Sequence, residues 1–446
     1  MSSVAAHQLD TWLRLHLHAR GDRSRLEAFR DRKLRFLIQQ ATARVPYYRT
    51  LFQEAGINPT SIQTAGDLSQ LPISSAQDYR ERPLQETLAE GTDPRRLFLR
   101  PTSGSSGRPF VVRRASREEH LINAFRLRAH AHCGLRSRDV VAAVVFFSKS
   151  HQRGHWLGRL RQRLGVRRLA PVNCLASADQ ILDRLIVLQP DVIQGFPGAI
   201  AQAAQRALER GVEIRPRRVV CGGETVTPFR RRVMEEAFGC PVYSFYGAQE
   251  FNLLAWQCPD TQAFHICEDN VILEVLRDGR PAEPGELGEV VATGLHSYQM
   301  PFIRYRIGDV VRQGDPQCEC GQPFATLQDI RGRRHDYFVW SDGSLFHPDR
   351  VVVPIMEAEA DWFDQYQLIQ ETHREVVLRI APSRPPTSTQ IEHVEQLARA
   401  ELPPDVVFRV ELVESVPPEP SGKQRYCVSR VASEGAEIGT VPVAAE

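Results

Sequence analysis

The sequence predicts an α/β protein with a large N-terminal domain of mixed, largely parallel sheets and a small C-terminal α+β domain. Three observations lead to this prediction. First, 446 residues are more than one compact core usually serves. Second, the middle of the chain alternates helical stretches with short apolar runs, namely DVVAAVVFF, DVIQGF, RRVVCGGE and PVYSFYG, which is typical of a parallel sheet flanked by helices. Third, NVILEVLRDG and GELGEVVATG indicate a β-rich subdomain from about residue 270.

The two ends of the chain are predicted to differ from this middle. Apolar residues recur at helical spacing over 24–44 and stop at Pro46, so the first hundred residues are predicted to be mainly helical. Near the other end we expect a strand, a helix and a strand, at 366–382, 388–403 and 406–417. We therefore divide the chain into an N-terminal domain, a C-terminal domain and a tail, with bounds 1–330, 331–434 and 435–446.

Composition excludes several classes of protein. A content of 42% hydrophobic residues is that of an ordinary globular protein. The net charge of +2 is too small to attract the whole molecule to nucleic acid or to an anionic membrane. The longest apolar run, Val140 to Phe147, fits a buried strand and is too short for a membrane span. The opening segment has no apolar signal sequence, and nine cysteines is an odd number, which favours reduced thiols or metal ligands. We expect a cytoplasmic protein.

The strongest local motif is PTSGSSGRPF, from Pro101 to Phe110. Two glycines and several hydroxyl side chains form a loop whose N–H groups can turn toward an anion. The spacing is not that of a Walker A loop. A flexible Ser/Gly linker is the alternative interpretation of this stretch.

Three further motifs follow in chain order. VVCGGETV predicts a strand that ends in a Gly-Gly turn, where α/β sheets bind ligands. SFYGAQEF places Glu250 just after a strand end, where a carboxylate can bind magnesium or simply cap a helix. In MPFIRYRIGDVV, Asp309 follows a glycine and can either cap a turn or accept hydrogen bonds from ribose hydroxyls.

A lysine near the C-terminus stands out against the arginines. The chain has only three lysines, Lys33, Lys149 and Lys423, among 56 basic Lys and Arg residues. Lys423 lies in PPEPSGKQRYC, a Pro-rich loop. A lysine offers a compact ammonium on a long stem, which the planar fork of arginine cannot reproduce. The alternative is an exposed surface lysine.

Taken in order, these motifs resemble the adenylate-forming superfamily of acyl- and aryl-CoA synthetases and luciferase-like enzymes. The nearest branch comprises phenylacetate–coenzyme A ligases and capsule-biosynthesis adenylating proteins. The resemblance implies that ATP activates a carboxylic acid to an acyl-adenylate with release of pyrophosphate. The acyl group then passes to coenzyme A or to an amine. It also implies that the small domain is mobile and closes to deliver its lysine.

The resemblance assigns roles to individual residues. Lys423 and Glu250 would be catalytic, with Glu250 also binding Mg²⁺. The nucleotide would be bound by Thr102, Ser103, Gly104, Ser105, Ser106, Gly107, Gly222, Gly223, Glu224, Tyr246, Gly247, Asp309 and Arg333. The chain departs from the family at the crossover, where two acidic residues are usual and His335-Asp336 stands here. That departure bears on the rotation before the second half-reaction. Arg108 also replaces a common lysine.

The acyl pocket in this family is built by segments before GGE and around YG. Here those segments supply Lys149, His151, Phe196, Pro197 and Tyr246. Lys149 could pair with a second charge on an acidic or amino-acid substrate, while an apolar or aromatic acid is the default expectation. A solvated loop is the alternative for the segment around Lys149. The acceptor is left open between coenzyme A, an amine and a carrier-protein thiol.

A structural zinc site is also predicted. Six residues separate Cys258 from His265, and Cys318 and Cys320 form a Cys-x-Cys-Gly knuckle. Three thiolates and one imidazole make a closed tetrahedral site, and the phenylacetate-ligase branch resembles this pattern. Buried free thiols with a surface histidine are the alternative, and Cys267 is close enough to compete as a ligand.

A nucleic-acid-binding protein is the remote alternative for the whole chain. The basic segment RLRQRLGVRRLAP and a zinc knuckle would support it. The near-neutral total charge and the ordered ATP motifs argue against it. We expect a small carboxylic acid and an acyl acceptor as partners, no nucleic acid or membrane, and allow for a homodimer.

Overall fold

The computed structural model describes residues 21–101, 111–145, 168–333, 338–342, 345–346, 348–359, 362–417 and 425–431. The chain forms two compact units. The first comprises Met1–Leu135 and Phe245–Arg331, and the second Arg136–Ser244 and Gly332–Glu446.

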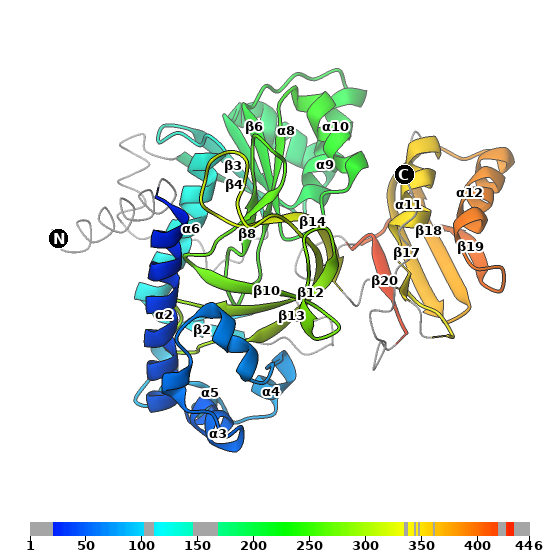
Figure 1. The fold of residues 1–446 in the computed structure, drawn as a ribbon. Coiled ribbons are helices and arrows are strands. Elements are labelled where there is room, and N and C mark those ends of the chain that lie inside the picture. The colour runs from blue at the N-terminus through cyan, green and yellow to red at the C-terminus, as the bar shows by residue number, and fades with distance from the viewer. Residues whose placement is uncertain are drawn as a thin grey trace. The chain divides into compact units, whose positions relative to one another are not determined.

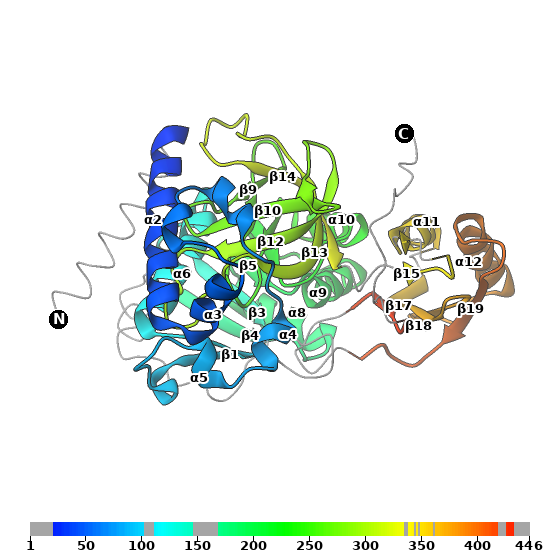
Figure 2. The same ribbon diagram turned by 60° about the horizontal axis from the view of Figure 1, so that its bottom comes forward.

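The first unit opens with helices, as predicted. Asp22 caps the first of them by accepting a hydrogen bond from the backbone N–H of Arg25 at 2.9 Å, and Pro46 begins the next. Short 3₁₀ turns separate the later ones. The helices are α2 (Arg23–Arg44), α3 (Pro46–Glu54), α4 (Ala76–Arg80), α5 (Leu84–Thr87) and α6 (Ser116–His132). Figures 1 and 2 show α2 and α6 along the same flank of this unit.

The strands of the first unit pair mainly antiparallel. A separate ribbon consists of β1 (Phe98–Pro101) and β2 (Val111–Arg114). The larger sheet runs in the order β11-β10-β12-β13-β14-β9-β8-β7. Its strands are β7 (Val242–Tyr246), β8 (Ala255–Gln257), β9 (Phe264–Ile266), β10 (Val271–Arg277), β11 (Arg280–Pro281), β12 (Leu287–Gly294), β13 (Tyr305–Gln313) and β14 (Thr326–Arg333). The predicted β-rich subdomain is this sheet, which packs its buried face against α2 and α3.

The second unit contains the predicted parallel sheet. Its order is β7-β6-β5-β3-β4, and the pairs β3–β4, β3–β5 and β5–β6 are parallel. Strands and helices alternate along the chain as β3 (Val140–Val145), β4 (Arg168–Asn173), α8 (Ala178–Leu188), β5 (Val192–Gly195), α9 (Pro197–Glu209), β6 (Arg218–Gly222) and α10 (Pro228–Phe238). The buried faces of α8, α9 and α10 share a core with these strands, so the predicted alternation is confirmed.

The C-terminal part of the second unit has its own four-stranded sheet and core, with order β19-β18-β17-β20. Helices α11 (Asp349–Glu359) and α12 (Ser388–Glu401) cover one side of it (Figure 1). The region predicted as one strand at 366–382 is an antiparallel hairpin, because the turn at His373-Arg374 divides it. The strands of this sheet are β17 (Phe363–Thr372), β18 (Glu375–Pro382), β19 (Val407–Leu412) and β20 (Cys427–Ser429). A separate antiparallel pair consists of β15 (Phe338–Val339) and β16 (Leu345–Phe346).

Within the described ranges, no helix combines the length and the apolar character that a membrane span requires. The parallel strands and the antiparallel subdomain match the predicted fold class.

Candidate active site and metal cluster

The predicted phosphate loop is carried by the ribbon of β1 and β2. The two strands pair from Phe98↔Arg114 to Pro101↔Val111. The last residue of β1, Pro101, is therefore paired with the first residue of β2, Val111. The motif itself lies outside the described residues, and this applies to Thr102, Ser103, Gly104, Ser105, Ser106 and Gly107. Their predicted role in phosphate binding therefore stays a prediction.

The segment that carries Glu250 is a tight loop after β7. The carbonyl of Ala248 accepts hydrogen bonds from the backbone N–H of Phe251 at 3.0 Å and from that of Asn252 at 2.7 Å. A Cβ atom at Gly247 would lie 2.0 Å from the carbonyl oxygen of Asn252, so only glycine fits there. Glu250 is 9% exposed. The close turn thus presents a carboxylate from a buried position.

Two motifs predicted separately exchange hydrogen bonds. Tyr246 donates its hydroxyl to Oδ2 of Asp309 at 2.7 Å, and Tyr305 donates to Oε1 of Glu250 at 2.9 Å. Tyr246 and Glu250 come from SFYGAQEF, whereas Tyr305 and Asp309 come from RYRIGD. All four side chains are at least 91% buried. The structure therefore brings the predicted ribose and magnesium carboxylates together on adjoining segments of the first unit.

The GGE motif forms a second group of predicted residues. β6 ends at Gly222, and Gly223 has a φ of +87°, a conformation that glycine adopts freely. Glu224 accepts hydrogen bonds from the backbone N–H of Gly198 at 3.0 Å and from Arg230 at 3.4 Å. Its carboxylate therefore lies at the positive end of the α9 dipole.

This contact also places the predicted substrate residues Phe196 and Pro197, which are the N-cap and first residue of α9. The fixed φ of Pro197 suits the start of a helix. The sequence had indicated neither Gly198 nor Arg230 as a contact of Glu224. Lys149 and His151, the other predicted pocket residues, lie outside the described residues.

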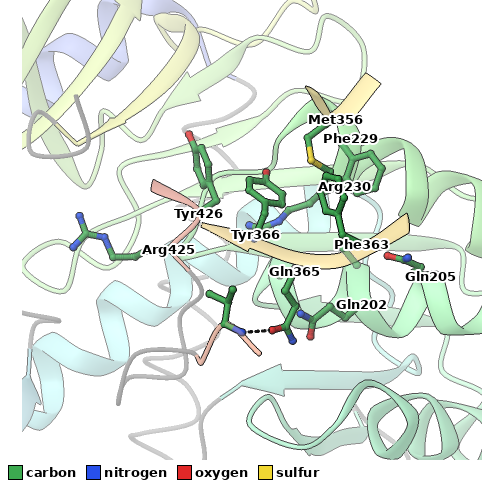
Figure 3. Close-up of a pocket in the computed structure, with 13 residues that line it drawn as sticks. Gln202, Gln205, Phe229, Arg230, Met356, Phe363, Gln365, Tyr366, Arg425 and Tyr426 are labelled. Carbon is green, nitrogen blue, oxygen red and sulfur yellow. Dashed lines mark hydrogen bonds between the residues drawn. The ribbon is translucent and has the colours of Figure 1, made fainter. Parts of the chain in front are cut away.

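The lysine predicted to be catalytic, Lys423, also lies outside the described residues, but both flanks of its segment are described. On one side, the backbone N–H of Val416 donates to Oε1 of Gln365 at 2.7 Å (Figure 3). On the other side, Gln367 donates its side-chain amide to the carbonyl of Arg425 at 2.9 Å. Gln365 and Gln367 are alternate residues of β17 and so point to the same face. The two flanks are thus fixed to one strand.

Neither glutamine was predicted as a functional residue. Gln367 lies within the strand predicted at 366–382 and Gln365 directly precedes it, so their Gln-x-Gln spacing was the available signal, since residues two apart in a strand share a face. Arg333 ends β14, and its side chain is outside the described part of the structure, as is His335.

A pocket in the second unit lies beside Gln365 (Figure 3). Aromatic, amide and guanidinium side chains line it, among them Phe229, Arg230, Tyr366, Arg425 and Tyr426. The predicted substrate residues Phe196 and Pro197 are not among its lining residues. The pocket is therefore not assigned to the acyl group.

The predicted zinc ligands form one cluster. They are Cys258, His265, Cys318 and Cys320, and their four sulfur and nitrogen ligand atoms all lie within 4.8 Å of one another. Cys320 Sγ lies 3.5 Å from Nε2 of His265. Cys267 is not part of this cluster, because its Sγ contacts Arg128 at 3.4 Å and Asp269 at 3.7 Å.

Aromatic rings hold the imidazole of this cluster. His265 is fully buried and stacks on Trp256, with ring centroids 5.2 Å apart and 10° between the planes. Trp256 in turn donates its indole N–H to Nδ1 of His132 at 2.9 Å. Burial lowers the pKa of His265 to about 3, and the neighbouring His132 and Arg128 act in the same direction. His265 therefore carries a neutral ring, which is the form that binds metal ions.

No protein-family model matches the chain. A phenylacetate–coenzyme A ligase from Thermus thermophilus is 26% identical over 378 residues, covering 81% of this chain and 83% of that protein. The chain resembles acid–coenzyme A ligases. A protein CapK from Staphylococcus aureus is also similar, at 20% identity over 411 residues and 86% of this chain. Both branches named from the motifs are among the relatives, so the predicted resemblance is confirmed.

Solved ligase structures show the same fold. A 2-hydroxyisobutyryl-CoA ligase in its postadenylation state, in complex with R3-HIB-AMP, gives a TM-score of 0.75 at 20% identity, with 93% of this chain and 91% of that chain covered. A benzoate CoA ligase from Burkholderia xenovorans gives a TM-score of 0.52 at 17% identity, covering 75% of this chain and 68% of that one. The fold class predicted from the sequence is that of these ligases.

Proposed function

We propose that this protein is an AMP-forming ligase that activates a carboxylic acid and passes the acyl group to coenzyme A. The observation that carries the proposal is the reciprocal pairing of Tyr246 with Asp309 and of Tyr305 with Glu250. It joins two motifs of the ligase resemblance in one buried site. The similarity to phenylacetate–coenzyme A ligases over most of the chain supports the same activity.

In the proposed first step, a carboxylate oxygen of the acid forms a bond to the α-phosphorus of ATP. The bond from that phosphorus to its bridging oxygen breaks, and pyrophosphate leaves. Asp309 would accept hydrogen bonds from the ribose hydroxyls in place of the phenol of Tyr246. Glu250 would hold Mg²⁺, which when bound neutralises charge on the phosphates. Lys423 would supply an ammonium to the charge that develops at the α-phosphate.

In the proposed second step, the sulfur of coenzyme A attacks the acyl carbon, and AMP leaves with the electron pair of its acyl bond. The thiol proton passes to solvent. A small domain that carries Lys423 during adenylation and then moves would separate the two steps. Whether an amine or a carrier-protein thiol takes the acyl group instead is decided by product masses, measured with each acceptor supplied in turn.

The experiment that tests the first step is carboxylate-dependent exchange between ATP and pyrophosphate. A panel should contain apolar, aromatic and acidic carboxylic acids, because Phe196, Pro197 and Tyr246 favour an apolar acid whereas Lys149 and His151 would favour a second charge. Exchange with at least one class supports the proposal. An absence of exchange with every class, in the presence of Mg²⁺, contradicts it.

We also propose that Cys258, His265, Cys318 and Cys320 hold a structural zinc ion. With Zn–S near 2.3 Å and Zn–N near 2.0 Å, a tetrahedral site has sulfur–nitrogen edges of about 3.5 Å. The separation between Cys320 and His265 matches this edge. Four protein ligands fill a tetrahedral shell, so the ion would stabilise the fold and would take no part in catalysis. Metal analysis of the purified protein should give one zinc per chain.

The proposed partners are a small carboxylic acid, an acyl acceptor and, in a homodimer, a second copy of the chain. Light scattering on a sizing column gives the oligomeric state directly.

A further inference from the structure

One buried carboxylate contacts both strands of the phosphate-loop ribbon, which is the pair of β1 and β2. Glu119, in the first turn of α6, is 6% exposed. It accepts from Nε of Arg100 on β1 at 3.1 Å and from Nη1 of Arg114 on β2 at 3.3 Å. Each strand of the ribbon therefore contributes one guanidinium to the same carboxylate. This arrangement anchors both strands of the β1–β2 ribbon.

The guanidinium of Arg114 reaches a second partner. Its Nη2 donates to the backbone carbonyl of Gln249, the residue directly before Glu250. Arg114 is 2% exposed and belongs to the largest fully buried side chains of the protein. Burial lowers the pKa of Arg114, and the negative charges of Glu119 and Glu250 offset only part of this effect. A single buried cation thus links the ribbon to the loop that carries the proposed magnesium ligand.

Helix α6 makes another contact with the same loop. Asn252 donates its side-chain amide to Oδ1 of Asn123 at 3.0 Å, and Asn123 donates to Oε1 of Glu119 at 3.1 Å. The loop from Gly247 to Asn252 is therefore attached to the Glu119 network at two points. One is the guanidinium of Arg114, and the other is the amide of Asn123.

We propose that Arg114 is a positioning residue, which sets the distance and orientation of Glu250 relative to the phosphate-loop ribbon. This inference rests on the proposed function, because it matters for the reaction only if the ribbon binds the triphosphate and Glu250 binds Mg²⁺. Arg114 acts through the backbone of Gln249, and nothing in the inference requires it to touch the nucleotide.

The geometry requires an arginine. Two nitrogens of the guanidinium, fixed in one plane, bind a carboxylate on one side and a carbonyl on the other. A lysine has a single nitrogen at its end and cannot reproduce this fork. Arg114→Lys keeps the positive charge beside Glu119, so it loosens the loop without leaving a buried carboxylate unpaired.

The test compares Arg114→Lys with Arg128→Lys. Arg128 is a matched control, because it is another buried arginine of α6's unit and pairs with Asp269 on a different segment. Both variants should lower the melting temperature. Only Arg114→Lys should raise the Mg²⁺ concentration for half-maximal pyrophosphate exchange, by about tenfold, since a charge-assisted hydrogen bond is lost at the magnesium loop. The KM for the carboxylic acid should stay unchanged.

A double-mutant cycle separates positioning from a structural role. In the Glu250→Gln background the magnesium ligand is already impaired, so Arg114→Lys should add less than about threefold to the Mg²⁺ requirement. If Arg114→Lys proves too unstable, Glu119→Gln offers a second change, which keeps one acceptor oxygen and replaces the other with a donor NH2 group, so that one of the two arginines loses its acceptor. It should shift the Mg²⁺ requirement in the same direction by a smaller factor.

A binding experiment tests the role of Arg114 without requiring turnover of a carboxylic acid. The affinity for ATP is measured by calorimetry at several Mg²⁺ concentrations, without any acid. Arg114→Lys should weaken the gain in affinity that Mg²⁺ provides, and Arg128→Lys should leave it intact. An unchanged Mg²⁺ response in Arg114→Lys, or an equal change in both variants, would overturn the inference. Wild-type ATP binding without exchange would instead contradict the proposed function alone.

Discussion

The loop of Glu250 and the segment of Lys423 are held in different ways. Two buried groups fix the carboxylate loop. The guanidinium cation of Arg114 donates to the carbonyl of Gln249, and the phenol of Tyr305 donates to the carboxylate of Glu250. The flanks of the lysine segment are fixed by the neutral amides of Gln365 and Gln367, which are half-buried. Hydrogen bonds to charged groups contribute about 1.5–3 kcal/mol, against about 0.5–1.5 kcal/mol for neutral pairs.

This difference indicates which changes couple activity to stability. Substitutions around Glu250 disturb a buried, charged network and should affect both. Substitutions at the glutamines should affect the delivery of Lys423 while sparing the cores. The two parts of the proposed machinery can therefore be separated by experiment.

The largest effect is expected at Lys423. Lys423→Ala should lower the rate of pyrophosphate exchange by about 100-fold or more, because a preorganised charge at the transition state is lost. The melting temperature should be close to that of the wild type, since the role proposed for Lys423 is electrostatic and does not involve core packing. Lys423→Arg is the informative companion, and it should be nearly as inactive despite keeping the charge. Full activity in Lys423→Arg would refute the argument from geometry.

The next effect is expected at the carboxylate itself. Glu250→Gln removes the charge that would bind Mg²⁺ and keeps the acceptor for Tyr305. Exchange should fall by about 10- to 100-fold at millimolar Mg²⁺ and recover in part as Mg²⁺ is raised. Tyr305→Phe serves as the control within the same pair, and its effect should be smaller because the charge remains. A loss that no amount of Mg²⁺ reduces would count against the assigned role.

A smaller effect is expected at the two glutamines that hold the flanks of the lysine segment. Gln367→Ala removes the side-chain bond to Arg425 and should lower the exchange rate by about three- to tenfold, with a melting temperature close to that of the wild type. Gln365→Ala should act similarly through Val416. Gln390→Ala, in the capping box of α12, is a control for the loss of a glutamine from the same region. If Gln367→Ala and Gln390→Ala lowered the activity equally, the bonds from Gln365 and Gln367 to the flanks of the lysine segment would have no specific effect on catalysis.

The smallest effect on activity is expected at the metal cluster. Cys318→Ser should lower the zinc content and the melting temperature, because the ion would no longer join the knuckle to β9 and to Cys258, which directly follows β8. The rate per folded molecule should change by less than about twofold. A Cys267→Ser variant tests the ligand assignment, since this thiol contacts Arg128 and Asp269 and should not alter the zinc content.

Most of the fold could be predicted because the periodicity of apolar residues within a short segment indicates whether it forms a helix or a strand. The parallel strands from Val140 to Tyr246 follow from apolar runs that alternate with amphipathic helices, and the β-rich region follows from period-two patterning. The zinc cluster follows from cysteine and histidine spacing once the two pairs are brought together. The hairpin at 366–382 was missed, because His373-Arg374 is not a recognisable turn sequence.

The contacts that organise the site could not be predicted in this way. Tyr246 and Asp309 are 63 residues apart, and only the tertiary fold joins them. Arg114 is one of 53 arginines and follows another arginine, so its burial against Glu119 leaves no trace in the local sequence. The ligase resemblance named the carboxylates and the lysine. The residues that hold them in place required the structure.

The most direct test of the account is carboxylate-dependent pyrophosphate exchange, measured for the wild type and for Lys423→Ala side by side. Exchange should require ATP, Mg²⁺ and one class of carboxylic acid, and its rate should fall by about 100-fold or more in the variant. Exchange in the variant at the wild-type rate, or no exchange in the wild type with any acid, would contradict it.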